Sequence, residues 1–258
     1  ITTTHSYYDC SSLKDFVLTR NDDDYSCSIP FNIIKEINLE IVIYPIFSKC
    51  AIKFDLERYN KNGEREIIKK DILKIDKNFK NSISLPIDKY INDIKSSSDF
   101  VYSLSGRTNN KKIPARMTYG FNYKQKSFGS NICDAMRINN EIKNKNFKNK
   151  SFYWGPVFNS KKMQTILALS SINTDLDTNC EIVNLKLYDQ EKILFSKKFK
   201  INNFEAINLD LKKIIKKSPK KTKNEILWFT LESKGSKNFI CKHVHRSIYG
   251  HISADYSF

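Results

Sequence analysis

The stretch EIVNLKLYDQEKILFSKKF, residues 181–199, decides the fold class of this chain. Val183, Leu185 and Leu187 alternate with polar residues, which is the period of two expected for a β-strand with one buried face. The pair Asp189-Gln190 then marks a turn before a second strand-like segment, so the stretch predicts an antiparallel hairpin. Similar short segments, separated by turn signals, recur along the chain and predict an all-β protein.

The two halves of the chain resemble each other, because five short segments of the first half match segments of the second half in the same order. The separations between matched segments are 127, 130, 124, 127 and 130 residues, a drift that small loop insertions would produce. The sequence therefore predicts a tandem duplication. The matches are Phe31-Asn32 with Phe158-Asn159, CAIKFDLERY (from Cys50) with CEIVNLKLY (from Cys180), ISLPIDKYI (83–91) with INLDLKKII (207–215), VYSLS (from Val101) with WFTLES (from Trp228), and RMTYG (116–120) with RSIYG (246–250).

Each half combines several short strand signals with one short helical candidate, PIDKYINDI (from Pro86) and DLKKIIKK (from Asp210). Many short strands in about 100 residues indicate an antiparallel β-sandwich. We therefore expect two tandem sandwiches of immunoglobulin-like or jelly-roll type, related by internal duplication. The first spans residues 1–138 with an N-terminal extension, the polar segment NNEIKNKNFKNK (139–150) is the linker, and the second spans residues 151–258.

The chain is strongly basic, with a net charge of +16 from 44 basic and 28 acidic residues. Only seven of the basic residues are arginines, so lysine dominates, as it does on solvated surfaces encoded by A/T-rich genomes. Because sequence-reading nucleic-acid binders favour arginine, nucleic acid ranks behind carbohydrate, protein or an anionic surface as a partner. The densest run is the best candidate for a patch that attracts an anionic partner: Lys212, Lys213, Lys216, Lys217, Lys220, Lys221 and Lys223.

The sequence shows no segment that marks a compartment. No run approaches 18 consecutive apolar residues, so we expect no transmembrane helix, and the first residues lack the pattern of a signal peptide. We expect a soluble protein whose compartment the sequence leaves open. The six cysteines include no CxxC pair and no zinc-finger spacing, which argues against a structural zinc site and leaves the disulfide state open.

The common catalytic signatures are absent from the sequence: there is no GxxxxGK[ST], GxGxxG, GxSxG or HExxH motif. With seven glycines in 258 residues, a glycine-rich phosphate loop is also excluded. The leading hypothesis is therefore a non-enzymatic binding or structural module that needs no cofactor.

Three of the four histidines, His243, His245 and His251, lie within nine residues of each other near the C-terminus. Residues two apart share a face of a strand, so His243 and His245 project side by side. If residues 247–250 form a hairpin turn, His251 returns on the next strand, with Asp255 on its face. Imidazoles with a carboxylate can bind Zn, Fe, Cu or Mn. The alternative hypothesis is therefore a metal-dependent enzyme with one transition metal ion at these four residues.

The predicted duplication offers an internal comparison for these histidines. The match of RMTYG with RSIYG aligns them with residues of the first half that cannot bind a metal, and it identifies Arg-x-x-Tyr-Gly as a shared turn element. On this alignment the second copy has added the histidines to an inherited hairpin. Their first-half counterparts would be Ile113, Ala115 and Phe121.

Overall fold

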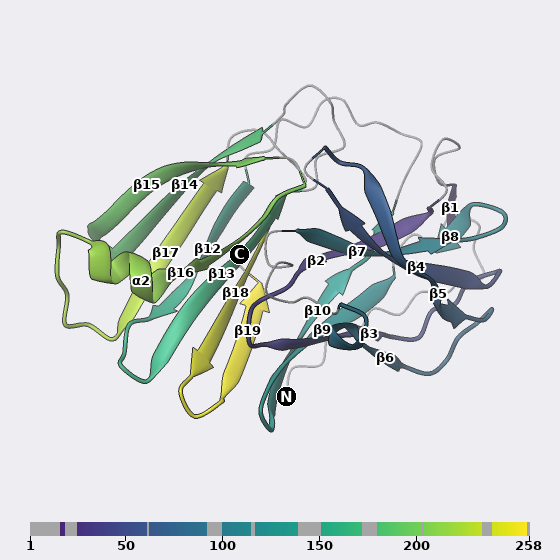
Figure 1. The fold of residues 1–258 in the computed structure, drawn as a ribbon, viewed down its shortest axis with the longest axis horizontal. Helices are drawn as coiled ribbons and strands as arrows, with labels where there is room; N and C mark the ends of the chain where they lie inside the picture. Colours follow the sequence, from purple (N-terminus) through teal and green to yellow (C-terminus); the bar gives the residue numbers. More distant parts are fainter. Residues whose placement is uncertain are drawn as a thin grey trace.

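The computed structural model describes residues 16–18, 25–60, 62–91, 100–114, 117–138, 151–171, 180–202, 204–233 and 239–256. Within these ranges the protein is all-β, with four large antiparallel sheets, one small sheet and one α-helix (Figure 1). The predicted linker, residues 139–150, lies outside the described residues, so the proposed domain boundary stays a prediction.

The first half contains two of the large sheets. Sheet 1 has the strand order β11-β2-β7-β4-β5, and sheet 2 has the order β10-β9-β3-β6; β1 and β8 form the small sheet. The bounds are β1 Phe16–Leu18, β2 Cys27–Asn32, β3 Asn38–Ile43, β4 Ile52–Tyr59, β5 Arg65–Ile75, β6 Ile83–Pro86, β7 Val101–Arg107, β8 Lys112–Pro114, β9 Thr118–Gln125, β10 Phe128–Ala135 and β11 Arg137–Ile138.

The second half contains sheet 3, with the order β12-β17-β14-β15, and sheet 4, with the order β16-β13-β18-β19. Counted along each half, sheet 3 has the same strand order as β2-β7-β4-β5 of sheet 1, and sheet 4 has the order of sheet 2. The bounds are β12 Ser151–Phe158, β13 Met163–Ser171, β14 Cys180–Asp189, β15 Lys192–Asn202, β16 Ala206–Asp210, β17 Ile226–Ser233, β18 Phe239–Ser247 and β19 Ile252–Tyr256.

The stretch that predicted a hairpin forms one: β14 and β15 pair antiparallel across the turn at residues 189–192. The two helical candidates differ from each other. The second forms helix α2 (Leu211–Lys217). Its first turn is capped, because the Asp210 side chain accepts hydrogen bonds from the backbone N–H groups of Lys212 and Lys213. The first forms only a 3₁₀ turn, η2 (Ile87–Lys89), which begins at Pro86 without any side-chain cap.

Three of the five sequence matches do not join equivalent positions. The match of Phe31-Asn32 with Phe158-Asn159 is displaced by three residues: Phe31 lies opposite Tyr102, but the residue opposite Phe229, the match of Tyr102, is Gly155. The match of CAIKFDLERY with CEIVNLKLY is displaced by one residue, because it aligns the buried Ile52 with Ile182, which is 58% exposed. The match of RMTYG with RSIYG is also wrong: Gly120 pairs inside β9, whereas Gly250 lies in the turn after β18 with φ +98°. The first-half counterparts that this match gave for the three histidines are therefore wrong as well: Ile113, Ala115 and Phe121.

The central strands of sheet 4, β13 and β18, are buried on both faces, and this placement determines the surroundings of the histidines. One face packs against sheet 3, since Leu167, Leu169 and Cys241 belong to the core of the second half. The other face supplies Ile166 and Val244 to the core of the first half. In Figure 1, strands β13, β18 and β19 accordingly lie between the first half and sheet 3.

A smaller contact joins the halves near the ends of β4 and β7. Phe204 stacks on Tyr59 with ring centroids 5.0 Å apart, and Ala206 packs with Val101 in the same buried cluster. The ring of Phe204 also covers Gly63, where a Cβ atom would lie 2.4 Å from Phe204 Cε2. A residue without a side chain is therefore required at position 63 for this contact to form.

Candidate functional site

The histidines of β18 lie side by side in the interior of the second half. The imidazole centroids of His243 and His245 are 4.9 Å apart, and their residues are only 3% and 4% exposed. His245 packs edge-to-face on Phe158 at 4.7 Å, and His243 on Phe229 at 5.9 Å. Both rings therefore contribute to the aromatic packing of the core.

The polar contacts of His245 suit a neutral ring. Its Nδ1 lies 2.9 Å from the Thr165 hydroxyl, whose oxygen accepts a hydrogen bond from the Phe158 N–H at 2.9 Å. Burial and, to a smaller extent, the neighbouring His243 together lower the pKa of His245 to about 3. Burial also lowers the pKa of His243, although Asp255 opposes that shift. The imidazoles are thus held uncharged near neutral pH.

His251 does not join the other two histidines. Ser247–Gly250 forms the expected turn, with the Ser247 N–H donating to the His251 carbonyl at 2.8 Å. The exposed His251 ring packs on Phe128 at a centroid distance of 4.2 Å, and Asp255 lies opposite His243 in the ladder. Within the described ranges, no group of three or more His, Cys, Asp or Glu residues is arranged to hold a metal ion.

The strand pairing shows which residues of the first half occupy the topologically matching positions of the buried histidines. Strand β9 pairs with β3 in the first half, and β18 pairs with β13 in the second half. At their C-terminal ends, β9 and β18 each lead through a hairpin turn into the next strand, β10 and β19 respectively. Counted back from these turns, His243 and His245 correspond to Phe121 and Tyr123, both of which are buried. The histidines therefore occupy positions that hold aromatic core residues in the first half.

The lysine run lies on and after helix α2, and several of its ammonium groups bind backbone carbonyls. Lys220 donates to the Ile193 carbonyl at 2.8 Å, and Lys212 to that of Lys161 at 3.1 Å. Lys221 donates at 3.3 Å to two carbonyls at the end of the helix, where cations are favoured. These three lysines thus stabilise local structure. Every lysine of the run except the half-buried Lys212 is exposed: Lys213, Lys216, Lys217, Lys220, Lys221 and Lys223.

The outer face of sheet 3 carries an aromatic row that the sequence reasoning missed. Trp154 and Trp228 are the two tryptophans of the chain; they are 43% and 42% exposed, with ring centroids 5.7 Å apart. Tyr188 lies directly opposite Trp228 on the next strand, and Phe152, on the same face as Trp154, is 51% exposed. We call these four residues the aromatic face. Monomeric proteins rarely expose such contiguous apolar rings unless the rings contact a partner.

Polar side chains border the aromatic face on the same side of sheet 3. Thr230 lies between Trp154 and Lys186 across three strands, and Asn184 lies opposite Glu232. The ammonium of Lys186 is 3.6 Å from the carboxylate of Glu232. The face thus combines ring surfaces with hydrogen-bonding groups, which is the composition of a recognition surface rather than of a core.

The sequence contained one signal for this face. In ILWFTLES the residues Leu227, Phe229 and Leu231 are buried, so Trp228 must project from the opposite side of the strand. The same alternation places Trp154 outward. Without the pairing of β12, β17 and β14, however, nothing in the sequence brings the rings into one row.

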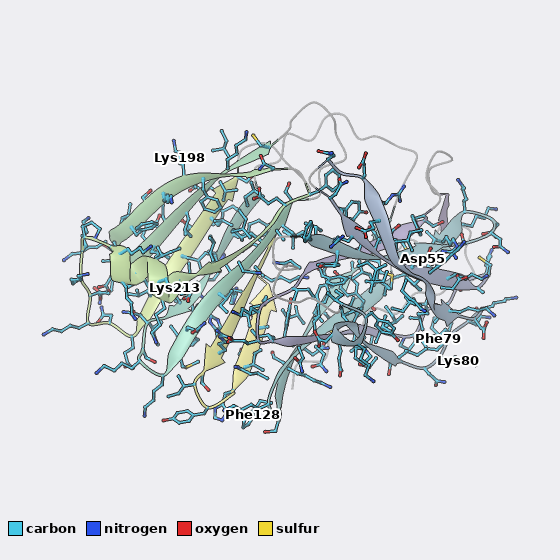
Figure 2. The ribbon with its side chains drawn as sticks, in the orientation of Figure 1. Asp55, Phe79, Lys80, Phe128, Lys198 and Lys213 are labelled. Carbon is cyan, nitrogen blue, oxygen red and sulfur yellow. The ribbon has the colours of Figure 1, made fainter. Side chains whose placement is uncertain are left out.

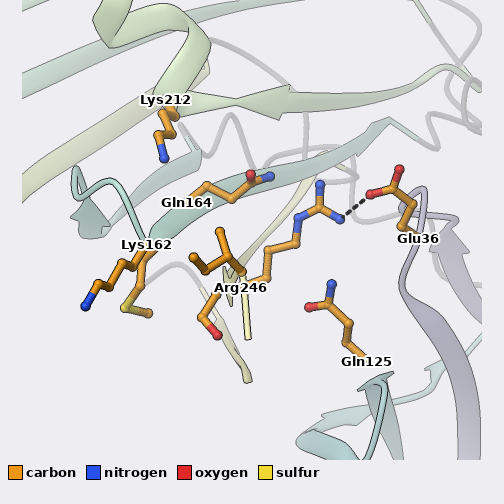
Figure 3. Close-up of a pocket in the computed structure, with 9 residues that line it drawn as sticks. Glu36, Gln125, Lys162, Gln164, Lys212 and Arg246 are labelled. Carbon is orange, nitrogen blue, oxygen red and sulfur yellow. Dashed lines mark hydrogen bonds and ion pairs between the residues drawn. The ribbon is translucent and has the colours of Figure 1, made fainter. Parts of the chain in front are cut away.

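A cavity of about 310 Å³ lies between the two halves (Figure 3). Arg246 crosses it and donates to Glu36 Oε2 at 3.1 Å and to the Lys35 carbonyl at 3.4 Å. When the Gln164 amide is oriented with its oxygen towards Arg246, that oxygen accepts hydrogen bonds from Arg246 Nε at 2.8 Å and from Arg246 Nη2 at 3.0 Å. The guanidinium is therefore engaged in joining the halves.

No helix in the part of the chain that the structure describes is long and apolar enough to cross a membrane.

Comparison with known proteins identifies no family for this chain. No protein-family model and no curated protein matches it. Similar solved structures include beta-glucuronidase 2 of Bacteroides uniformis (8% identity, 90% of this chain and 26% of that chain, TM-score 0.25). Another is the BSP domain of a biofilm-associated protein (10% identity, 99% of this chain and 61% of that chain, TM-score 0.24). A third is the serine-rich repeat protein Srr2 of Streptococcus agalactiae (9% identity, 95% of this chain and 92% of that chain, TM-score 0.21). The chain spans only part of the first two, and TM-scores this low carry no inference.

Proposed function

We propose that this protein is a non-enzymatic glycan-binding module made of two duplicated β-sandwiches, and that the aromatic face of sheet 3 contacts the glycan. The observation that carries the proposal is the exposed row of Trp154, Trp228 and Tyr188 on three adjacent strands. Neighbouring strands are about 4.8 Å apart, so the row extends across roughly 10 Å.

The chemistry of a sugar chain matches this surface. The C–H faces of pyranose rings are apolar and pack on aromatic side chains, while the hydroxyl groups at the ring edges need hydrogen-bond partners. Trp and Tyr supply large apolar rings with little loss of conformational entropy. Thr230, Asn184 and Glu232, which border the row, supply donors and acceptors.

Two features favour a glycan over a second copy of the chain. A chain with a net charge of +16 repels its own copies, which opposes self-association through this face. The charged residues Lys186 and Glu232 also lie directly beside the rings, whereas homodimer interfaces are more apolar and depleted of charge.

The proposed duplication explains why the aromatic face is open in one half only. In sheet 1, Tyr59 of β4 lies opposite Val101 of β7. In sheet 3, Tyr188 of β14 lies opposite Trp228 of β17 in the same way. In sheet 1 this position is covered by the Phe204 contact that joins the halves. In the second half the equivalent position is exposed. The matching strand orders of the sheets further support the duplication.

Affinity electrophoresis in gels that contain a panel of soluble polysaccharides tests the proposal. The wild-type protein should be retarded by at least one polysaccharide, and Trp154→Ala combined with Trp228→Ala should remove the retardation. Loss of ring contacts at the centre of a binding surface reduces affinity by about tenfold or more.

Phe47→Ala is a matched control, because Phe47 is an exposed ring, 39% accessible, that lies outside sheet 3. This variant should be retarded like the wild type. Unfolding transitions confirm that each variant folds. Wild-type migration that no polysaccharide changes, or retardation that survives loss of both tryptophans, would contradict a glycan site at this face. Concentration-dependent association that the tryptophan substitutions remove would instead identify a protein interface.

A further inference from the structure

A group of basic residues borders the aromatic face on strands β14 and β15. Lys198 lies opposite Asn184, and Lys200 lies opposite Ile182, so both project from the same side of sheet 3 as the tryptophans. Both side chains are exposed, and Figure 2 shows Lys198 pointing away from the sheets. We call Lys186, Lys198 and Lys200 the basic border.

The basic border carries an excess of positive charge that this side of the sheet does not neutralise. Among the described residues that project from it, Glu232 is the only acidic one, and it lies 3.6 Å from the ammonium of Lys186. Lys198 and Lys200 face Asn184 and Ile182, neither of which is charged. The face as a whole is therefore cationic.

The position of Lys186 connects this charge to the aromatic row. Lys186 and Tyr188 are two residues apart on β14 and share a face, and Lys186 lies opposite Thr230, the neighbour of Trp154. A chain that packs on the rings of Trp228 and Tyr188 thus passes beside the Lys186 ammonium. Negative groups on that chain would be attracted by Lys186 and by the two lysines beyond it.

We infer that the glycan bound at this face is polyanionic, carrying carboxylate or sulfate groups at regular intervals. This inference rests on the proposed function, because it assigns the class of glycan to the same site. The rings supply attraction for the sugar faces, and the basic border selects charged chains over neutral ones.

Matched pairs of polymers test the inference by titration calorimetry. Polygalacturonate is compared with its fully methyl-esterified form, and dextran sulfate with dextran, so that only the charge differs within a pair. The wild type should bind at least one charged polymer more tightly than its neutral partner. That preference should fall as the salt concentration rises, because binding releases counterions.

Lys198→Gln with Lys200→Gln should weaken binding to the charged polymer by about tenfold at low salt, since each exposed ion pair accounts for about threefold. Binding to the neutral polymer should not change. The control, Lys69→Gln with Lys70→Gln, removes the same charge from exposed positions on β5, the equivalent strand of the first half. It should leave binding to both polymers close to that of the wild type.

The outcomes separate the inference from the proposed function. If the wild type bound charged and neutral polymers with equal affinity, and the tryptophan substitutions removed that binding, the polyanion inference would be overturned but the glycan site would stand. Equal losses in the β15 variant and in the β5 control would also overturn it, because they would indicate attraction to the net charge alone. Binding that is insensitive to the tryptophan substitutions with every polymer would overturn the proposed function itself. Preference for only one charged pair would distinguish carboxylate from sulfate.

Discussion

Lowering the pH from 7 to 5 should destabilise the fold through His245, whose buried surroundings lower its pKa from 6.5 to about 3. The unfolded chain binds a proton at this residue below its ordinary pKa, whereas the folded protein does not until the pH approaches about 3. Protons therefore favour the unfolded state across this interval. The stability contributed by the neutral ring is complete above pH 6.5 and is lost as the pH falls towards about 3.

The magnitude follows from linkage. One pKa unit corresponds to about 1.4 kcal/mol, so the interval of about 1.5 units between pH 6.5 and pH 5 removes about 2 kcal/mol from the free energy of unfolding. That is a large fraction of the stability of a typical domain, which is about 5 to 15 kcal/mol. His243, whose pKa is also lowered by burial, adds to the loss with the same sign.

The assay is urea unfolding of the wild type and of two variants at pH 7 and pH 5. His245→Asn removes the titrating ring but keeps an oxygen that can accept from the Thr165 hydroxyl. Because it also leaves a cavity, the compared quantity is the change in unfolding free energy between the two pH values, and that change should be about 2 kcal/mol smaller than in the wild type. Phe47→Ala is the control, because it changes an exposed residue that does not titrate, and it should keep the wild-type pH dependence.

Two results would refute this reasoning. The first is a wild-type stability that is the same at pH 7 and pH 5. The second is a His245→Asn variant whose stability depends on pH as steeply as that of the wild type, since the proton uptake would then belong to other groups.

Three further predictions follow from single contacts. Gly63→Ala should lower the unfolding free energy by about 1 kcal/mol or more, since φ is +82° and the new Cβ would clash with Phe204. Gly129→Ala should lower it less, because the atom nearest to the new Cβ is 3.4 Å away. Thermal unfolding measures both effects. Asp210→Ala should lower stability by about 1 kcal/mol by removing the cap of α2, and Asp210→Asn should restore most of it in urea unfolding. Elemental analysis of the purified protein should find less than one transition metal ion per chain. The metal-dependent enzyme hypothesis would instead be supported if the wild type held one metal ion per chain and a folded variant without the three terminal histidines held none.

The all-β fold could be predicted because alternation and turn signals are local. In residues 181–199 the pattern identified the strands, the hairpin and the buried side of β14. The correspondence between the halves was harder to predict, because short matches such as RMTYG with RSIYG recur by chance. Only the ladder shows that Gly120 lies inside a strand and Gly250 in a turn.

The candidate site could be predicted only in part, for a physical reason. Alternation shows that His243 and His245 share a face, but not that both faces of β18 are buried. Likewise, Trp154 and Trp228 are 74 residues apart in the sequence, and only the pairing of β12 with β17 brings their rings to 5.7 Å. Contacts set by strand pairing between distant segments are not encoded in any local pattern.

The most direct test of the glycan-binding account uses the intrinsic fluorescence of the protein. Both tryptophans of the chain lie on the aromatic face, so their emission reports on that face alone. Titration with a polysaccharide that retards the protein should shift the emission to shorter wavelength and saturate, because the sugar removes water from the rings, and the same titration of the Phe47→Ala variant should give the same curve. A polysaccharide that binds with unchanged tryptophan emission would show that the glycan contacts another surface, and it would contradict the account.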